Sequence, residues 1–139
     1  MGANREYKNT VFTKLFSEPV ALILVSLLHF FPDSEATGGI IATLMNALPP
    51  GSYLVATHAA VVEYAPEQYA SLKARFREYM PQGTGSSRDS GEFARMAFAG
   101  LELIPPGVVL VSEWRPDDDG PRPLPAEVGC VGGVARKPA

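Results

Sequence analysis

Two histidines each stand at the end of an apolar segment, where a strand would bring them to the edge of a sheet. His29 follows the run Val20–Leu28, and His58 follows the run Ser52–Thr57. Because imidazole has a pKa near neutral, such a side chain can take a proton from a hydroxyl or an amine. Either histidine could instead serve the fold, with His29 held by loop carbonyls and His58 capping a helix or a loop. Both interpretations stay open here.

Other polar side chains could add to a site at the same edge. Arg88, in the Gly/Ser-rich loop Pro81–Gly91, could meet an anionic acceptor or be a solvated loop charge. A metal site built from both histidines with Asp33 or Glu63 lacks the usual ligand spacing, so we expect none. The run Asp117–Asp119 lacks the spaced carboxylates and the final Glu of a calcium loop, and we expect an exposed hairpin tip.

The composition is that of an ordinary globular domain, with 46% hydrophobic and 19% charged residues in a chain of 139. The net charge is −3 and the basic residues do not cluster, which argues against a nucleic-acid or membrane-binding surface. Cys130 is the only cysteine, so an internal disulfide is excluded and a cytoplasmic setting is expected. The longest apolar run, Val20–Phe31, is shorter than the roughly 20 residues of a membrane span. Met1–Thr10 lacks the apolar core of a signal peptide.

The elements that would position the two histidines alternate between strands and helices. Val20–Leu28 is apolar on both faces, which is typical of an interior strand in a parallel α/β sheet. The apolar stripe of Gly39–Leu48 predicts a helix, and Ser52–Thr57 predicts a second buried strand. Such a crossover connects parallel strands with a right-handed turn. Ahead of it, the spacing of apolar residues in Ala3–Glu18 predicts a short amphipathic helix.

The second half predicts two helices and then three strands. One helix spans Pro66–Met80, and Asp89 with Glu92 resembles the capping box of another that ends at Ala99. The predicted strands are Leu101–Ile104, Val108–Trp114 and Val128–Ala135, the last two forming an antiparallel hairpin. Gly132 and Gly133 indicate a bulge or a close backbone approach. The fold class is therefore α/β, with two parallel strands followed by an antiparallel pair, about half of an open doubly wound sheet.

Several motifs, taken in their order and spacing, resemble one protein family across residues 17–138. The matching stretches are Pro19–Leu22, Leu28–Asp33, Ala47–Leu54, His58–Ala59, Gly100–Leu103, Pro106–Val108, Trp114–Asp117 and Gly132–Pro138. Together they resemble the actinomycete-type S-adenosyl-L-methionine-dependent methyltransferases, a class I, Rossmann-like family formerly known as a domain of unknown function. The segment before Ser17 departs from that pattern.

The resemblance implies a sheet ordered 3-2-1-4-5-7-6, of which this chain supplies strands 4, 5, 6 and 7. The Gly-rich loop after strand 1 and the acidic residue after strand 2, which hold most of the cofactor in the family, have no counterpart here. Gly83, Gly85 and Gly91 lie between two predicted helices instead. We therefore expect a single partial domain over residues 1–139, corresponding to the C-terminal half of the family's fold.

The resemblance also implies where a site would lie. In open α/β sheets, ligands bind beyond the carboxyl ends of the strands, where the strand order switches. By resemblance, backbone groups near Leu27 and Leu28 would face the amino-acid end of S-adenosyl-L-methionine, and His29 and Phe30 would lie near the transferred methyl group. His29 is then the candidate general base. His58 and Arg88 would lie on the side of the small-molecule methyl acceptor, whose identity no motif reveals.

Two classes of function follow. The chain could be a methyltransferase that is completed by another polypeptide or that keeps a weak residual activity. It could instead be a non-catalytic remnant or interaction module that keeps the half-fold. In either case, strand Val20–Leu28 would lack a neighbour on one side, leaving unpaired backbone and apolar side chains. We therefore expect self-association or a partner chain along that edge.

Overall fold

A computed structural model describes residues 16–79 and 85–139 of the chain. The helix expected over Ala3–Glu18 lies outside the described residues, apart from residues 16–18, which form turns and bends. Residues 80–84, which include the end of one expected helix and the start of the expected Gly/Ser-rich loop, lie outside them as well.

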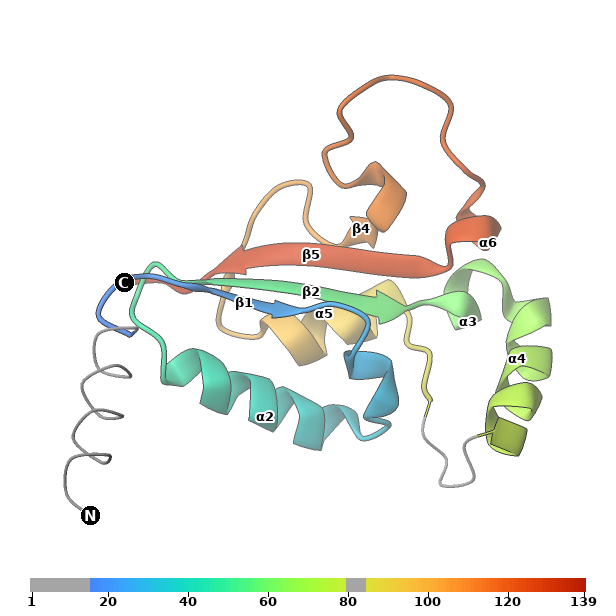
Figure 1. Cartoon of the computed structure of the whole chain (residues 1–139), viewed down its shortest axis with the longest axis horizontal. Helices are drawn as coiled ribbons and strands as arrows, with labels where there is room; N and C mark the ends of the chain where they lie inside the picture. The colour runs from blue at the N-terminus through green and yellow to red at the C-terminus, as the bar shows by residue number, and fades with distance from the viewer. Residues whose placement is uncertain (1–15, 80–84) are drawn as a thin grey trace, which may run out of the picture.

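The described residues form one mixed sheet of five strands (Figure 1). The strands are β1 (Ala21–Leu24), β2 (Tyr53–Ala59), β3 (Glu102–Leu103), β4 (Val109–Leu110) and β5 (Cys130–Arg136). Their order is β1-β2-β5-β3, and β4 also pairs with β5. β1 and β2 are parallel, whereas β5 is antiparallel to β2, β3 and β4. This confirms the expected strand order and the expected change from parallel to antiparallel pairing.

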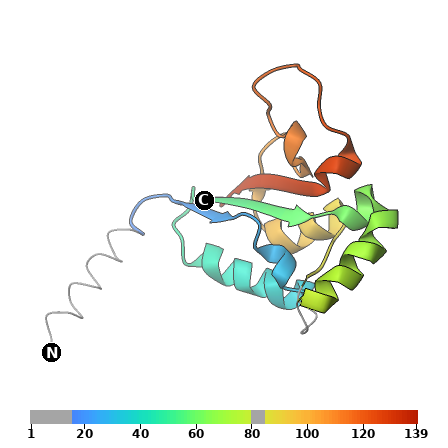
Figure 2. The ribbon, with the colours of Figure 1, turned by 45° about the vertical axis from the view of Figure 1, so that its right-hand side comes forward.

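Two of the described helices, α2 (Ser34–Asn46) and α5 (Ser90–Phe98), cover one face of this sheet. The others are α3 (Val61–Tyr64), α4 (Pro66–Tyr79) and α6 (Pro125–Val128), with the 3-10 helices η1 (Leu28–Phe30) and η2 (Val111–Glu113). Figure 1 shows α2 and α5 on the same face, while the loop between β4 and α6 extends from the other face. Turning the molecule shows α3 and α4 beyond the carboxyl end of β2 (Figure 2). In the part of the chain that the structure describes, no helix is long and apolar enough to cross a membrane.

The first strand is shorter than the sequence predicts, and it lies at the edge of the described sheet. The strand was expected to continue to Leu28, but β1 ends at Leu24. Ser26 has a φ of 53°, a left-handed conformation that a pleated strand cannot contain. Its backbone N–H donates to Thr57 Oγ1 at 3.0 Å, which fixes this turn against β2. The chain then enters η1, so the expected end of a strand is a turn followed by a helix.

Helix α2 begins five residues before the expected start at Gly39. Asp33 caps it, because its Oδ1 accepts a hydrogen bond from the backbone N–H of Ala36 at 2.9 Å. Packing explains the glycine at position 38 in this helix. A Cβ on Gly38 would lie 3.1 Å from the carbonyl oxygen of Met96 in α5, so a small residue allows α2 and α5 to lie close together.

The core lies between the sheet and the pair α2 and α5. Alternate residues of β2 point into it, and the paired glycines of β5 allow the other elements to approach closely. A Cβ on Gly133 would lie 3.1 Å from the ring of Phe98, and one on Gly132 would lie 3.2 Å from a methyl of Thr57. The register of β5 against β2 is continuous, so the close approach is confirmed and the alternative of a bulge is wrong.

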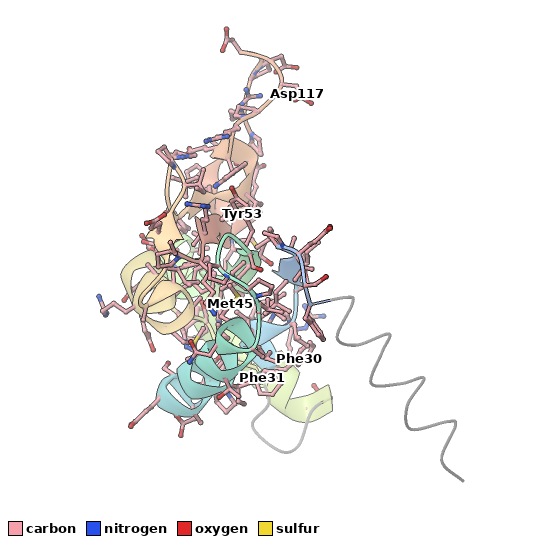
Figure 3. All side chains as sticks on the ribbon, turned by 90° about the vertical axis from the view of Figure 1, so that its left-hand side faces the viewer. Phe30, Phe31, Met45, Tyr53 and Asp117 are labelled. Atoms are coloured by element: carbon pink, nitrogen blue, oxygen red, sulfur yellow. The ribbon has the colours of Figure 1, made fainter. Side chains whose placement is uncertain are left out.

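The C-terminal strands are also shorter than expected. The strand predicted over Val108–Trp114 is limited to β4, because the chain turns into η2 directly after it. Its antiparallel pairing with β5 is confirmed, with Val109 opposite Gly132. Asp117, Asp118 and Asp119 are exposed, as expected, and Figure 3 shows Asp117 on the loop that extends away from the sheet.

Candidate functional site

The candidate site lies where β1 and β2 end, because the expected residues come together there. The segment of residues 86–88 binds the backbone of η1, which follows β1, and the backbone at the end of β2. Ser86 donates its N–H to the carbonyl of His29 at 2.8 Å, and Arg88 donates its N–H to the carbonyl of Ala59 at 3.1 Å. The hydroxyl of Ser87 donates to the same carbonyl of Ala59 at 3.1 Å. The loop therefore joins η1 to the end of β2.

Arg88 is the centre of this arrangement, and it is 2% exposed. All five N–H groups of its guanidinium find acceptors. The acceptors are Ser34 Oγ for Nε (2.7 Å), His58 Nε2 (2.6 Å) and Ser86 Oγ (3.0 Å) for Nη1, and the carbonyls of Phe31 (2.7 Å) and Pro32 (3.0 Å) for Nη2. The expectation of a solvated loop charge is therefore wrong. With every donor used inside the protein, none is left over for an anionic acceptor in this arrangement.

The charge of Arg88 is balanced by carboxylates. Glu92 Oε1 lies 3.5 Å from Arg88 Nε and also accepts a hydrogen bond of 2.7 Å from Ser34 Oγ. Burial lowers the pKa of Arg88, while Glu92 and then Asp33 raise it. Arginine keeps its proton in proteins, so the cluster contains a buried cation. A buried charge is tolerated when it is paired and fully hydrogen-bonded, as it is here.

His58 is the neutral partner of Arg88. Its ring is 1% exposed, and Nδ1 lies 2.7 Å from the carbonyl of Ala59. A carbonyl only accepts, so Nδ1 carries the proton and Nε2 accepts from Arg88. Burial lowers the pKa of His58 to about 4; the bond to Ala59 opposes this effect, and the nearby Arg88 adds to it. Both ring nitrogens of His58 therefore have partners inside the protein, whereas its expected place on the acceptor side stays a prediction.

His29 differs from His58 because it is only half-buried and lies in η1. Its ring lies 4.2 Å from that of Phe30, and burial lowers its pKa. The ring is therefore neutral near pH 7, the form that accepts a proton. The two histidines are close enough to interact electrostatically, since His29 contributes to lowering the pKa of His58.

The neighbouring residues of η1 present an apolar surface. Leu27 is 42% exposed and Phe30 is 36% exposed, whereas the side chain of Leu28 is buried in the core. Figure 3 places Phe30 and Phe31 on the side of the sheet that carries α2. The carbonyls of Leu27 and Leu28 accept the N–H groups of Phe30 and Phe31, both at 3.1 Å, so η1 is closed by its own hydrogen bonds.

The carboxylates considered as metal ligands have other partners. Asp33 caps α2, and Glu63 accepts from the backbone N–H and the hydroxyl of Ser90 at 2.6 and 3.1 Å. Across residues 16–79 and 85–139, no three His, Cys, Asp or Glu side chains gather in a way that could hold a metal ion.

A second feature borders the site: the outer face of β1 is apolar and open. Ile23 is 63% exposed and Val25, just beyond the strand, is 51% exposed. The register sets Ala21 opposite Tyr53, so Tyr53 lies on the same sheet face as Ile23, and it is 38% exposed. We call Ile23, Val25 and Tyr53 the open β1 face.

Several residues of the cluster were not identified from the sequence. Ser34, Ser86 and Glu92 carry its hydrogen bonds, yet short polar residues of this kind are common in loops and first turns of helices. The local signal that could have been used is the helix start at Asp33, which places Ser34 in a first turn near the end of β1.

Comparison with known proteins agrees with this geometry. A family model described as S-adenosyl methyltransferase matches residues 6–138. A DUF574 family protein from Streptomyces avermitilis is similar in structure, with 34% identity and a TM-score of 0.76 over 88% of this chain and 46% of that one. A methyltransferase candidate from Thermobifida fusca has 33% identity and a TM-score of 0.74 over 89% of this chain and 45% of that one. No curated protein matches the chain.

A more distant structure agrees in fold alone. The SAM-dependent methyltransferase from Methanosarcina mazei has 15% identity and a TM-score of 0.52 over 85% of this chain and 58% of its own. The chain spans just under half the length of the proteins from S. avermitilis and T. fusca, and its strand order is that of the C-terminal half of the class I methyltransferase fold. The chain belongs to the S-adenosyl methyltransferase family.

Proposed function

We propose that this chain is the C-terminal half of a methyltransferase that uses S-adenosyl-L-methionine, and that strands added at the free edge of β1 complete its cofactor site. The observation that carries the proposal is the position of β1. It is parallel to β2, it has one hydrogen-bonded neighbour among the described strands, and η1 follows it directly. Doubly wound sheets bind ligands beyond the carboxyl ends of their strands, next to the point where the strand order switches.

The described residues fit one wall of such a site. Leu27 and Phe30 offer exposed apolar surface, and the half-buried His29 offers a neutral imidazole. Asp33 is the nearest carboxylate in sequence after η1, but its Oδ1 already caps α2. On this proposal, the acidic group that binds the ribose hydroxyls belongs to the added strands. The chain fits part of the cofactor, which supports a site shared with additional strands.

The cofactor would supply an electrophilic methyl group on a sulfonium. The residues of this chain would orient the acceptor and remove its proton. His29 is the candidate general base, because its pKa is lowered by burial and its ring is not engaged by Arg88, unlike that of His58. Methyl transfer depends strongly on holding the nucleophile in line with the methyl group, so the place of η1 would matter as much as the basicity of His29.

A second candidate function is a non-catalytic module that binds a partner through β1. It is favoured by the position of β1 at the edge of the described sheet, because an edge strand without charged residues is a template for pairing with another chain. Residues 19–28 contain no Asp, Glu, Lys or Arg. Self-association along this edge is the simplest form of that candidate.

Complementation would test the proposal. The N-terminal part of the S. avermitilis protein would be mixed with this chain or fused to it, and binding of S-adenosylhomocysteine would be measured by calorimetry. We expect binding by the combination and weak or no binding by either part alone. The test variant is Ile23→Lys, which places a charge on the open β1 face. Its control is Leu103→Lys, which places a charge at an exposed position on β3, at the other edge of the described sheet.

The outcomes separate the two candidates. Ligand binding that Ile23→Lys abolishes and Leu103→Lys leaves intact would support the methyltransferase. A stable complex, or a dimer of this chain, without any binding of S-adenosylhomocysteine would favour the interaction module. A chain that stays monomeric at high concentration and ignores both the added half and the ligand would overturn both.

A further inference from the structure

Arg88 joins three parts of the molecule that are far apart in sequence. Its guanidinium binds the carbonyls of Phe31 and Pro32 after η1, the hydroxyl of Ser34 at the start of α2, and the ring of His58 at the end of β2. Its own backbone precedes α5, which supplies Glu92. These contacts span 30 to 57 residues of sequence, so the cluster organises the tertiary arrangement rather than one local turn.

The contacts converge on the segment that contains His29. Downstream of His29, Arg88 Nη2 holds two successive carbonyls. At His29 itself, the carbonyl accepts from Ser86 N–H at 2.8 Å and from Ser86 Oγ at 3.3 Å, and the same Oγ accepts from Arg88 Nη1. Arg88 therefore reaches His29 through Ser86 on one side and through Phe31 on the other, without touching its ring in any hydrogen bond.

A planar guanidinium is suited to this task. Five donors in a fixed plane can bind acceptors in several directions at once, which an ammonium on a flexible stem cannot reproduce. Neutral His58 accepts one of them and adds no second positive charge to the cluster. Ser34 links Arg88 to Glu92, since its hydroxyl accepts from Arg88 and donates to the carboxylate.

We infer that Arg88 is a positioning residue of the site: by binding Ser86 and the carbonyls that follow η1, it fixes where His29 and Phe30 lie, and it does not bind the methyl acceptor. The inference rests on the proposed function in that the site it positions is the one proposed above. The buried guanidinium, which binds Ser86 and neutral His58, holds the candidate base in place.

The first test needs no cofactor. The pKa of His29 would be followed by NMR in the full chain and in Arg88→Lys. In the parent chain we expect a pKa below the ordinary value, because η1 holds the ring half-buried. In Arg88→Lys we expect it to shift back toward the ordinary value, together with changed amide resonances in residues 27–31. Arg115→Lys is the matched control, since Arg115 also binds a backbone carbonyl, that of Pro105, but is exposed and lies outside the cluster.

If Arg88→Lys does not fold, Ser86→Ala gives the same information with the charge left in place. It removes the hydroxyl that links Arg88 to the carbonyl of His29 while leaving the backbone bond from Ser86 N–H. The expected result is a smaller shift in the same direction. A purely structural Arg88 would lower stability but leave the pKa of His29 unchanged in the folded chain, and that result in both variants would overturn the inference.

The second test uses the complemented protein and S-adenosylhomocysteine. We expect Arg88→Lys to lose affinity for this ligand and Arg115→Lys to keep it. If the parent combination binds no ligand, the proposed function fails, and the NMR shift at His29 still decides the positioning role. If the parent binds and Arg88→Lys binds equally well with an unshifted His29, Arg88 does not position the site.

Discussion

Two regions next to β1 differ in an unusual way: a charged side chain is buried beyond the end of the strand, and an apolar side chain is exposed on its outer face. At the end of the strand, Arg88 is 2% exposed and every one of its donors has an acceptor. On the outer face, Ile23 is 63% exposed. Arginine is almost never fully buried unless it is paired, while isoleucine is among the residues most often buried. One region is therefore complete within the described chain, and the other has apolar surface that nothing in the described residues covers.

This difference indicates what the chain can do without further strands. The polar cluster needs no ligand or partner to satisfy its hydrogen bonds, so it can hold η1 and His29 in place in the half-fold. The open β1 face gains from being covered, because burial of apolar area is favourable by about 25 cal/mol per Å². The position of the candidate base and the completion of the site are thus carried by separate regions.

The largest expected effect is that of removing the buried charge. Arg88→Met leaves Ser34, Ser86, His58 and two carbonyls without their donor, and we expect a loss of about 3–5 kcal/mol of unfolding free energy. Denaturant unfolding would measure it. Arg122→Met is the control, because Arg122 pairs with Asp118 at an exposed loop and such pairs contribute about 1 kcal/mol or less. Equal losses in the two variants would remove the distinction between a complete interior cluster and a surface pair.

Acid should weaken the same cluster. The pKa of His58 is about 4 in the folded chain, against an ordinary value of 6.5, because burial disfavours the cation and Arg88 repels it. The unfolded chain takes up this proton first, so stability present above about pH 6.5 declines until about pH 4. The loss attributable to His58 is about 3 kcal/mol. His29, Arg88 and Glu92 are the charged or titratable groups that act on it.

His58→Gln would isolate this contribution. The amide oxygen of glutamine can accept from Arg88 but cannot be protonated in this range. We expect the variant to show a flatter dependence of unfolding free energy on pH between about 6.5 and 4 than the parent chain. An identical dependence in both proteins would mean that other groups, and not His58, control stability in acid.

Much of the fold could be predicted from the sequence because its signals are local. The apolar run after Pro19 located β1, the stripe after it located α2, and Asp89 before Glu92 located the start of α5. The ends of these elements were harder to predict. β1 ends early because Ser26 turns and binds Thr57, a contact across 31 residues that no local pattern contains.

The candidate site could be predicted only in outline. The sequence indicated that His29 and His58 would lie at neighbouring strand ends; the structure has His58 in β2 and His29 in η1, where Ser86 and Arg88 connect the two. It did not indicate that His58 would be buried or that Arg88 would be enclosed, because the acceptors of Arg88 lie up to 57 residues away. A loop arginine in a Gly/Ser-rich segment is usually solvated, so the local composition favoured the wrong alternative.

The smallest expected effect is on the open face itself. Leu24 is 9% exposed and packs in the core, whereas its neighbour Ile23 points to the open face. Leu24→Ala should cost about 2–3 kcal/mol of unfolding free energy, and Ile23→Ala less than about 0.5 kcal/mol in the chain alone. In the complemented protein the cost of Ile23→Ala should rise, because a completed doubly wound fold carries helices on both faces of the sheet and would bury that side chain. Denaturant unfolding of the parent, Ile23→Ala and Leu24→Ala proteins, once as the chain alone and once in the complemented protein, would measure these free energies. If Ile23→Ala costs the same with and without the added half, the edge of β1 is not where the fold is completed.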